Sequence, residues 1–285
     1  MRISMPAIYA HRRFGEEVAK TLPNAYTQLI AQYPEAFTLG TEGPDILFYH
    51  RPMKTNDVRQ RAYYLHALSG NELFLHFGKK LIQSAKGEDV LSSNGAFAAY
   101  VCGFLCHFTL DASTHLYIDE HSGKAVTHGK IESEFDKYLL RLDKKPTRGY
   151  NTATPILDAN GSKEAVAKAL DVPEETVAIA IKTMRKYNGW FSKKCELFHV
   201  FVHFVLKILG KDRQFGDMFL HKKDDPLCTE INEVLIVKWQ DAIPIGAALI
   251  ETYFNRLSEW VHTQHIDIDL FQYDFSGIIS KINKE

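Results

Sequence analysis

Cysteine is scarce in this chain, and its few copies show no spacing typical of a metal site. There are four cysteines among 285 residues. Cys102 and Cys106 lie one helical turn apart in an apolar stretch, so we interpret them as reduced residues of the core. Cys195 and Cys228 have no partner at metal-ligand spacing. This usage fits a reduced, cytoplasmic protein best.

The chain also lacks excess charge and a long hydrophobic run. Its net charge is -1 and its pI about 6.9, so no overall field draws it to nucleic acid or to an anionic membrane. Its first residues lack the pattern of a signal peptide, and we expect none. The longest apolar run, 197–210, contains His199, His203 and Lys207 and is too short and too polar to cross a bilayer. We interpret it as core packing, with a surface that contacts a lipid interface as the alternative.

What the chain does have is a strong helical periodicity. Helices are predicted over 14–32, 58–84, 94–116, 128–142, 162–170, 173–187, 190–209 and 232–262, the last interrupted at Pro244, with a loop over 40–44. The predicted fold is therefore all-α, a single multi-helix bundle in one domain over 1–285. Residues 1–142 would form the metal-site half, and 143–285 would hold a connecting loop and the C-terminal helices. The 94–116 helix is apolar nearly all round, which predicts that it is buried.

Three polar side chains recur at every fourth position of that apolar helix. His107, Asp111 and His115 therefore share one face and rise about one turn apart. A buried carboxylate is costly unless something pairs with it, and a zinc-like dication would bind both imidazole nitrogen and carboxylate oxygen. A hydrogen-bonded triad without a metal is the alternative. His128 and Glu132 repeat the four-residue step further along the chain, which indicates more than one ion.

Further candidate ligands lie upstream of this helix. His11 is near the start of the sequence, and Asp45 stands at a bend after Gly43-Pro44. His66 and His76 both lie in an apolar segment. Taken alone, each of these residues is better explained by a surface position or by a satisfied place in the core.

The order of these residues resembles that of the zinc-dependent phospholipase C family, an order that the single-strand-specific zinc nucleases share. It runs His11, Gly43-Pro44-Asp45, Leu65-His66, His107-x-x-x-Asp111-x-x-x-His115 and His128-x-x-x-Glu132. The resemblance spans roughly residues 5–140, and more faintly the rest. It favours His66 over His76, because His66 follows Asp45 more closely.

The resemblance implies an all-α protein with two to three zinc ions in a cleft between helices. One zinc would be held by Asp45, His66, His107 and Asp111, its close neighbour by His115, His128 and Glu132, and the third by His11 and a bridging Asp111. Secreted members also hold the third zinc with an N-terminal Trp, whereas this sequence has no Trp before Trp190. Choline-selective members have an aromatic residue after the acid equivalent to Asp45, where this chain has Ile46, so a preference for choline lipids is not implied.

The implied activity is metal-dependent hydrolysis of phosphoric diesters, of the phospholipase C type. Two dications close together would clamp a phosphoryl oxygen and a water and lower the pKa of that water. Asp45 would be the catalytic residue that orients or deprotonates the water. The expected partner is a phosphodiester or phospholipid substrate, with transient contact to a membrane surface and no stable nucleic-acid partner. The alternatives are a single-strand nuclease, which the near-neutral charge disfavours, and a non-catalytic metal-binding protein that keeps the fold.

Overall fold

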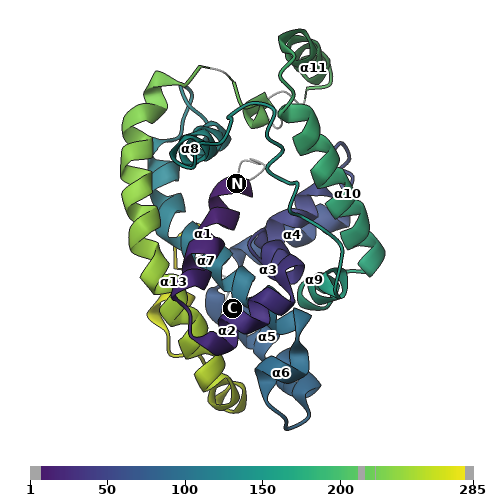
Figure 1. Ribbon diagram of the computed structural model, residues 1–285, viewed down its shortest axis with the longest axis vertical. Helices are drawn as coiled ribbons and strands as arrows, with labels where there is room; N and C mark the ends of the chain where they lie inside the picture. The colour runs from purple at the N-terminus through teal and green to yellow at the C-terminus, as the bar shows by residue number, and fades with distance from the viewer. Residues whose placement is uncertain (1–7, 211–215, 222, 280–285) are drawn as a thin grey trace.

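The computed structural model describes residues 8–210, 216–221 and 223–279, and it confirms the predicted all-α fold for them (Figure 1). In chain order the elements are α1 (Ile8–Thr21), α2 (Asn24–Gln32), α3 (Pro34–Gly40), η1 (Gly43–Tyr49), α4 (Asp57–Ala67), α5 (Gly70–Ala85), α6 (Val90–Asn94), α7 (Ala96–His121), α8 (His128–Leu142), α9 (Ser162–Leu170), α10 (Glu174–Phe191), α11 (Glu196–Ile208), η2 (Gly216–Met218), η3 (Pro226–Cys228), α13 (Thr229–Thr263) and η4 (Asp269–Gln272). Within these ranges the only β pairing is an isolated bridge between Tyr273 and Ile279.

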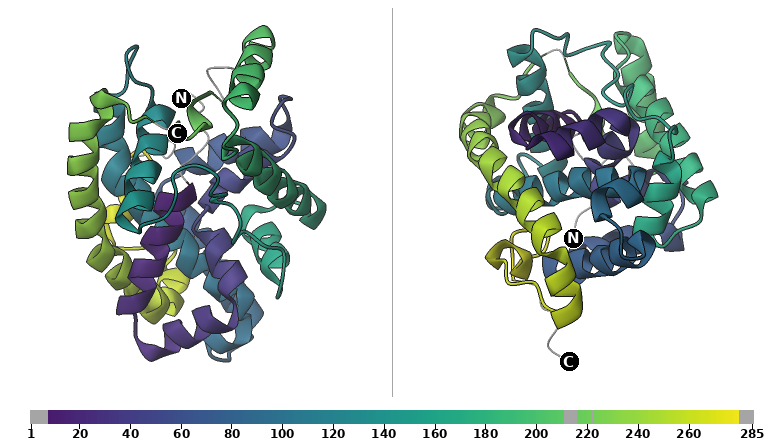
Figure 2. Two further views of the ribbon diagram at one scale, coloured as in Figure 1. Left: turned by 45° about the horizontal axis from the view of Figure 1, so that its top comes forward. Right: turned by 60° about the horizontal axis from the view of Figure 1, so that its bottom comes forward.

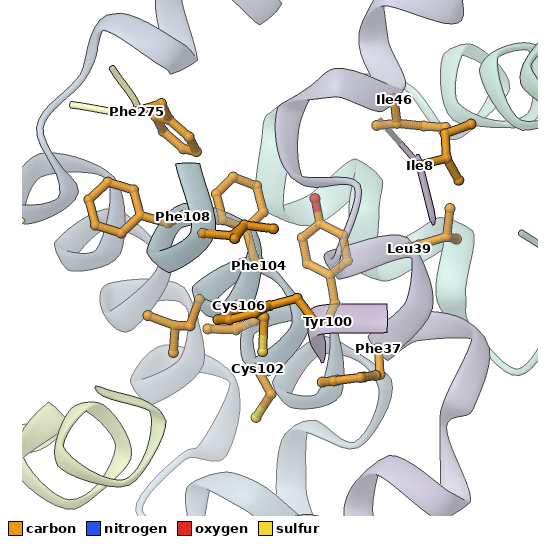
Figure 3. Packing of buried hydrophobic residues seen from close by; sticks show 14 of the residues in the cluster. Ile8, Phe37, Leu39, Ile46, Tyr100, Cys102, Phe104, Cys106, Phe108 and Phe275 are labelled. Atoms are coloured by element: carbon orange, nitrogen blue, oxygen red, sulfur yellow. The ribbon is translucent and has the colours of Figure 1, made fainter. Parts of the chain in front are cut away.

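Helix α7 runs through the middle of the molecule, as its composition predicts (Figure 1). By length and composition alone it would qualify as a membrane span, but 83% of its apolar window is buried inside the protein. Phe104 and Phe108 of α7 pack edge-on against Phe275 from the end of the described chain (Figure 3). Cys102 and Cys106 are buried in the same helix and free of any disulfide, as predicted. Helix α7 is therefore the core helix on which the other elements pack.

Helix α3 lies against α7 at backbone contact distance, because both helices carry glycine at the crossing. A Cβ on Gly40 would lie 2.2 Å from the Tyr100 carbonyl oxygen, and a Cβ on Gly103 would lie 2.1 Å from the Phe37 carbonyl oxygen. A larger residue at either position would force the two backbones apart. Figure 3 shows Phe37 and Tyr100 close together beside this crossing. The contact fixes α3, and the η1 segment that follows it, against α7.

Helices α1, α8 and α13 lie on the opposite side of the molecule from α9 and α10 (Figures 1 and 2). The start of α1 is held by Asp136 of α8, whose carboxylate accepts the backbone N–H groups of Tyr9 (3.1 Å) and Ala10 (2.8 Å). N–H groups in a first helical turn have no partner in their own helix, and a carboxylate there also complements the helix dipole. Because His11 follows directly, this contact sets its position.

Two predicted boundaries near the start of the chain are wrong, and proline explains both. The 14–32 stretch forms two helices, because Pro23 cannot continue α1 and instead stands at the N-cap of α2. The loop predicted over 40–44 is confined to Thr41 and Glu42, because Pro44 occupies an early position of η1, where a missing N–H costs nothing.

Pro244 does not interrupt the last long helix, contrary to the prediction. Helix α13 runs unbroken from Thr229 to Thr263 with Pro244 inside it. The proline lies on the exposed side of the helix, where water can satisfy the carbonyl that loses its partner. Helix α13 therefore packs along α7 and α1 as one piece.

The prediction of core packing for the apolar run 197–210 is also wrong. The helix predicted over 190–209 is two helices, since α10 continues to Phe191 and α11 begins at Glu196. His199 and Leu206 of α11 are buried, but its other side presents large apolar side chains to solvent. The composition of a helix shows that it has an apolar face, but it does not show whether another element covers that face.

Candidate metal centre

The centre of the site is one face of α7, where three side chains follow one another at four-residue steps. Asp111 stands in the middle, with one carboxylate oxygen 3.1 Å from His107 Nε2 and the other 3.2 Å from His115 Nε2. His107 and Asp111 are buried, and His115 is partly exposed. The helical repeat predicted from the sequence therefore does bring the three groups onto one line.

Helix α1 brings a third imidazole to the same carboxylate. His11 Nε2 lies 3.2 Å from Asp111 Oδ1. Its ring also stacks on that of His107, with the ring centroids 4.4 Å apart. Asp111 therefore has three imidazoles around it, from two helices that are nearly a hundred residues apart in the chain.

Asp45 in η1 and His66 in α4 extend the cluster on the far side of His107. Asp45 Oδ1 lies 2.9 Å from His66 Nε2, and Asp45 Oδ2 lies 3.7 Å from His107 Nε2. Gly43 makes this approach possible, because a Cβ there would lie 2.3 Å from the His107 ring. Gly43 also has a φ of +52°, which favours glycine. The Gly-Pro-Asp turn is therefore shaped around the histidine that it faces.

Helix α8 supplies the third part of the cluster. Glu132 Oε1 lies 3.3 Å from His128 Nε2 and 3.6 Å from His115 Nε2. Thr127 begins the helix, since its side chain accepts the backbone N–H of Lys130. This N-cap sets where α8 starts and places His128 in its first turn.

The outer nitrogens of three of these histidines are held by partners that aim the inner nitrogens at the cluster. Nδ1 of His66 lies 2.7 Å from the Ala62 carbonyl oxygen, and Nδ1 of His107 lies 3.0 Å from the Thr41 carbonyl oxygen. A carbonyl only accepts, so in both rings Nδ1 carries a proton and Nε2 is the nitrogen that can bind a metal. Nδ1 of His128 lies 2.7 Å from Asp119 Oδ1. Histidines that bind metals are usually held in this way.

The charges around Asp111 balance one another. Burial by itself raises the pKa of Asp111, but His115, His107 and His11 outweigh it and hold that pKa well below its usual range. Burial opposes the charged form of His107, yet Asp111 and Asp45 raise its pKa to about 9. The pKa of His11 falls to about 4, first through burial and then through the charge of His107. Without a metal the cluster thus holds its negative charge by keeping protons on only some of its imidazoles.

The α8 part behaves in the same way. Burial disfavours the charged imidazole of His128, but Glu132 and Asp119 raise its pKa to about 10. Burial would raise the pKa of Glu132, but His128 and His115 hold it well below its usual range. Both parts are therefore sites where positive charge is strongly favoured beside a buried carboxylate.

The residues fit metal ions because protein groups alone do not satisfy them. Nε2 of His107, both oxygens of Asp111 and Oε2 of Glu132 are buried and make no hydrogen bond of normal geometry among the described residues, even where an imidazole lies near. Such atoms are costly to bury, and a dication would engage all of them. Three groups have donor atoms within 4.8 Å of one another, namely His11 with His107 and Asp111, Asp45 with His66 and His107, and His115 with His128 and Glu132. Nitrogen and carboxylate oxygen donors of this kind suit zinc.

A small cavity of about 20 Å³ lies against this cluster, with room for an occupant about the size of a water. His11, Asp111 and Glu132 contribute polar atoms to its lining, and Ile118 and Phe135 are among its apolar neighbours. A space of this size beside the His11 and Glu132 groups can hold one water.

The eight side chains predicted from the sequence all lie in this one cluster: His11, Asp45, His66, His107, Asp111, His115, His128 and Glu132. The rival His76 does not, since it is exposed and pairs with Asp171 at 2.9 Å. The group around His11 is completed by His107, which already belongs to the next group. The N-terminal Trp of secreted relatives has no counterpart before Trp190, and residues 1–7 lie outside the described part of the chain.

Two buried acids beside the cluster were not predicted. Both oxygens of Glu42 are buried without a hydrogen-bond partner in the described structure, and burial raises its pKa well above the usual range. Burial also raises the pKa of Asp136, to about 7, although its carboxylate accepts the N–H groups at the start of α1. Each stands close to a predicted ligand in the sequence, Glu42 before Gly43-Pro44-Asp45 and Asp136 four residues after Glu132. That proximity was the available signal.

Comparison with known proteins agrees with the resemblance seen in the sequence. A family model described as zinc dependent phospholipase C matches residues 10–199. The matched region contains all eight side chains of the cluster. No curated protein and no solved structure matches the chain.

Proposed function

Because this chain belongs to the zinc-dependent phospholipase C family, we propose that it hydrolyses phospholipids at the phosphate–glycerol bond. The products would be diacylglycerol and the phosphorylated headgroup. The observation that carries this is the convergence of eight imidazole and carboxylate groups from four helices and η1 on one buried centre. The donor set fits a multinuclear zinc site, in agreement with the family.

Three groups of residues would hold the ions: His11 with His107 and Asp111, Asp45 with His66 and His107, and His115 with His128 and Glu132. Bound zinc supplies a Lewis acid for the phosphoryl oxygens and lowers the pKa of water. The protein contributes a fixed arrangement of donors, since the histidines are oriented by Ala62, Thr41 and Asp119. A fixed site stabilises the developing charge of the transition state without reorganising.

Asp45 is our candidate for the base that takes the proton of the attacking water. It is a carboxylate on η1 with its two oxygens directed at two different imidazoles. As the water oxygen bonds to phosphorus, its proton passes to Asp45, and the bond from phosphorus to the glycerol oxygen breaks. The departing diacylglycerol oxygen takes a proton from solvent water, and Asp45 releases its own to solvent, so that the carboxylate is restored.

A phospholipid suits this chain better than a nucleic acid. The net charge of -1 provides no attraction to a polyanion. Ile46 follows Asp45 where choline-selective relatives have an aromatic ring, so we propose no preference for choline headgroups. Contact with the membrane would be transient and confined to substrate capture.

The test is hydrolysis by zinc-loaded protein with its metal content measured in the same sample. Turnover of a chromogenic phosphodiester, followed by faster release of headgroup from lipid micelles than of nucleotides from single-stranded DNA, supports the proposal. Protein that contains zinc but hydrolyses neither the chromogenic phosphodiester nor the lipid overturns it. His115→Ala then separates the remaining alternatives, because a purely structural metal site would lose thermal stability in this variant while the wild type hydrolyses nothing.

A further inference from the structure

The outer side of α11 carries an apolar surface that we call the α11 ridge. It consists of five side chains that are each 62 to 81% exposed: Leu197, Val200, Phe201, Phe204 and Ile208. Their spacing of three and four residues places them on one side of the helix. His199 and Leu206, on the other side, are buried. A surface helix of a globular protein usually has the opposite arrangement, with polar residues outside.

The α11 ridge stands at the same end of the molecule as the metal-binding helices. Figure 1 shows α11 projecting from the end at which α1 begins and α8 lies, and the left view of Figure 2 agrees. His11 is in the first turns of α1, and His128 is the first residue of α8. A membrane that contacts α11 would therefore lie at the end of the molecule where α1 and α8 begin.

Positive charge borders the α11 ridge. Lys193 and Lys194 precede the helix, Lys207 lies in its last turn, and Glu196 is the only acid between positions 193 and 209. The Lys193 ammonium lies 4.4 Å from the centre of the ring of Phe198, the residue that follows Leu197 on α11. Apolar and aromatic side chains flanked by lysine are typical of helices that bind lipid interfaces.

We propose that the α11 ridge docks the protein onto a phospholipid bilayer that contains anionic lipid. The apolar side chains enter the boundary between headgroups and acyl chains, and the lysines meet lipid phosphates. A second copy of the chain is a poorer occupant, because pairing two ridges would bring two sets of lysines together. The inference rests on the proposed function, since a protein with a lipid substrate has to bind a membrane surface to reach it.

The experiment is flotation of full-length, zinc-loaded protein with vesicles of phosphatidylcholine and phosphatidylserine. The test variant is Phe201→Glu with Phe204→Glu, which places two charges in the ridge. The matched control is Val237→Glu, which changes a half-exposed apolar residue of α13, a helix drawn apart from α11 in Figure 1. We expect the wild type and control to float, and the ridge variant to partition roughly tenfold or more weakly. Lys193→Gln with Lys194→Gln should weaken partitioning by roughly fivefold per lysine, and added salt should remove that difference.

Hydrolysis of a short-chain phospholipid dissolved as monomers separates this proposal from the proposed function. The ridge variant should cleave that substrate at the wild-type rate while it loses activity on vesicles. Ridge-dependent flotation without any hydrolysis would leave the docking surface in place and remove the proposed function. Unchanged flotation of the folded ridge variant overturns docking, and so does a wild type that cleaves monomers but does not float. Ridge-dependent dimers in sedimentation, without flotation, would assign the surface to a second copy instead.

Discussion

The cluster around Asp111 and the outer face of α11 depart in opposite directions from the usual distribution of side chains. In the first, charged groups are buried in the middle of an apolar helix. In the second, leucine, valine, isoleucine and phenylalanine side chains are exposed to solvent. Each arrangement costs free energy in the protein alone. Buried polar atoms without partners are unfavourable, and so is apolar surface that is exposed to water.

The two regions differ in how closely their partner is specified. At the metal centre, distances, orienting hydrogen bonds and charge all restrict the partner to small cations with nitrogen and oxygen ligands. At α11, area and charge select a kind of surface but no particular atom. Buried polar groups without protein partners therefore identify the kind of ligand that they bind. Exposed apolar side chains identify only a class of partner.

The largest effect is expected at the centre of the cluster. Asp111→Ala removes the carboxylate that three imidazoles surround, so we expect turnover to fall on the order of a thousandfold, with loss of bound zinc. His76→Ala is the matched control, because it removes an exposed histidine whose partner is a surface acid. Activity on a chromogenic diester and metal content measure both. Full activity and normal zinc content in the Asp111 variant would contradict this prediction. The Asp111 carboxylate would then have no role in binding the metal.

Removal of the metal should change how stability depends on pH. In the metal-free protein the pKa values of His107 and His128 are raised to about 9 and about 10. The stability that they contribute is complete below the ordinary imidazole pKa of about 6.5 and is lost as pH rises through about 9 to 10. Zinc competes with those protons, so its stabilisation grows as pH rises over the same interval.

Thermal unfolding of chelated and zinc-loaded protein at several pH values tests this difference. We expect the zinc-loaded midpoint to be higher by roughly 10 °C or more near neutral pH. The gap between the two midpoints should widen as pH increases. A gap that narrows with rising pH would mean that the histidines do not exchange protons for metal.

The glycine that faces His107 should matter to activity more than its size suggests. Gly43→Ala places a Cβ 2.3 Å from the His107 ring and forces alanine into a positive φ. We expect an activity loss of roughly tenfold to a hundredfold, and a stability loss of about 1–3 kcal/mol. Gly87→Ala is the control, since Gly87 also has a positive φ but no atom near its Cβ. If both variants lose activity equally, backbone strain and not the contact with His107 is responsible.

A smaller effect is expected from the residue that holds the start of α1. Asp136→Asn keeps the shape of the side chain but removes its charge, and it weakens the acceptor for the Tyr9 and Ala10 N–H groups. We expect roughly tenfold weaker binding at the group that contains His11, with the other groups little changed. Zinc stoichiometry under limiting chelator measures this. Uniform loss of all ions would show that α1 supports the whole cluster.

The smallest effect should be the stability of ridge variants, which sharpens the contrast with the buried site. Phe204→Ser removes a large apolar side chain, but because that side chain is 62% exposed, the free energy of unfolding should change by only about 0.5 kcal/mol. Phe104→Ser in the buried core is the comparison, where a loss of about 3–5 kcal/mol is expected. Denaturant unfolding of both variants gives the numbers. A large loss for Phe204→Ser would mean that α11 packs more tightly than its exposure indicates.

Much of the site could be predicted because its ligands repeat at helical spacing. His107, Asp111 and His115 lie on one face of α7, and His128 and Glu132 lie on one face of α8, so local geometry brings each set together. The choice of His66 over His76 depended on the resemblance to a family. The structure separates the two by burial, since His66 is buried beside Asp45 and His76 is at the surface.

Other features depend on contacts that a sequence does not display. The roles of Glu42 and Asp136 follow from burial and from hydrogen bonds to segments far away in the chain. The exposure of α11 likewise depends on which elements happen to lie beside it. The continuation of α13 through Pro244 also depends on its surroundings, since the proline is on the exposed side, where water can satisfy the freed carbonyl.

The glycine pair at the crossing of α3 and α7 has a consequence for how this scaffold can be altered. Because the backbones of α3 and α7 are in contact at Gly40 and Gly103, the two helices are fixed relative to each other. This contact also fixes the position of Asp45 relative to His107. Grafting the centre into another protein would require α3, η1 and α7 to be transferred together, with α1, α4 and α8 placed around them to supply the remaining ligands.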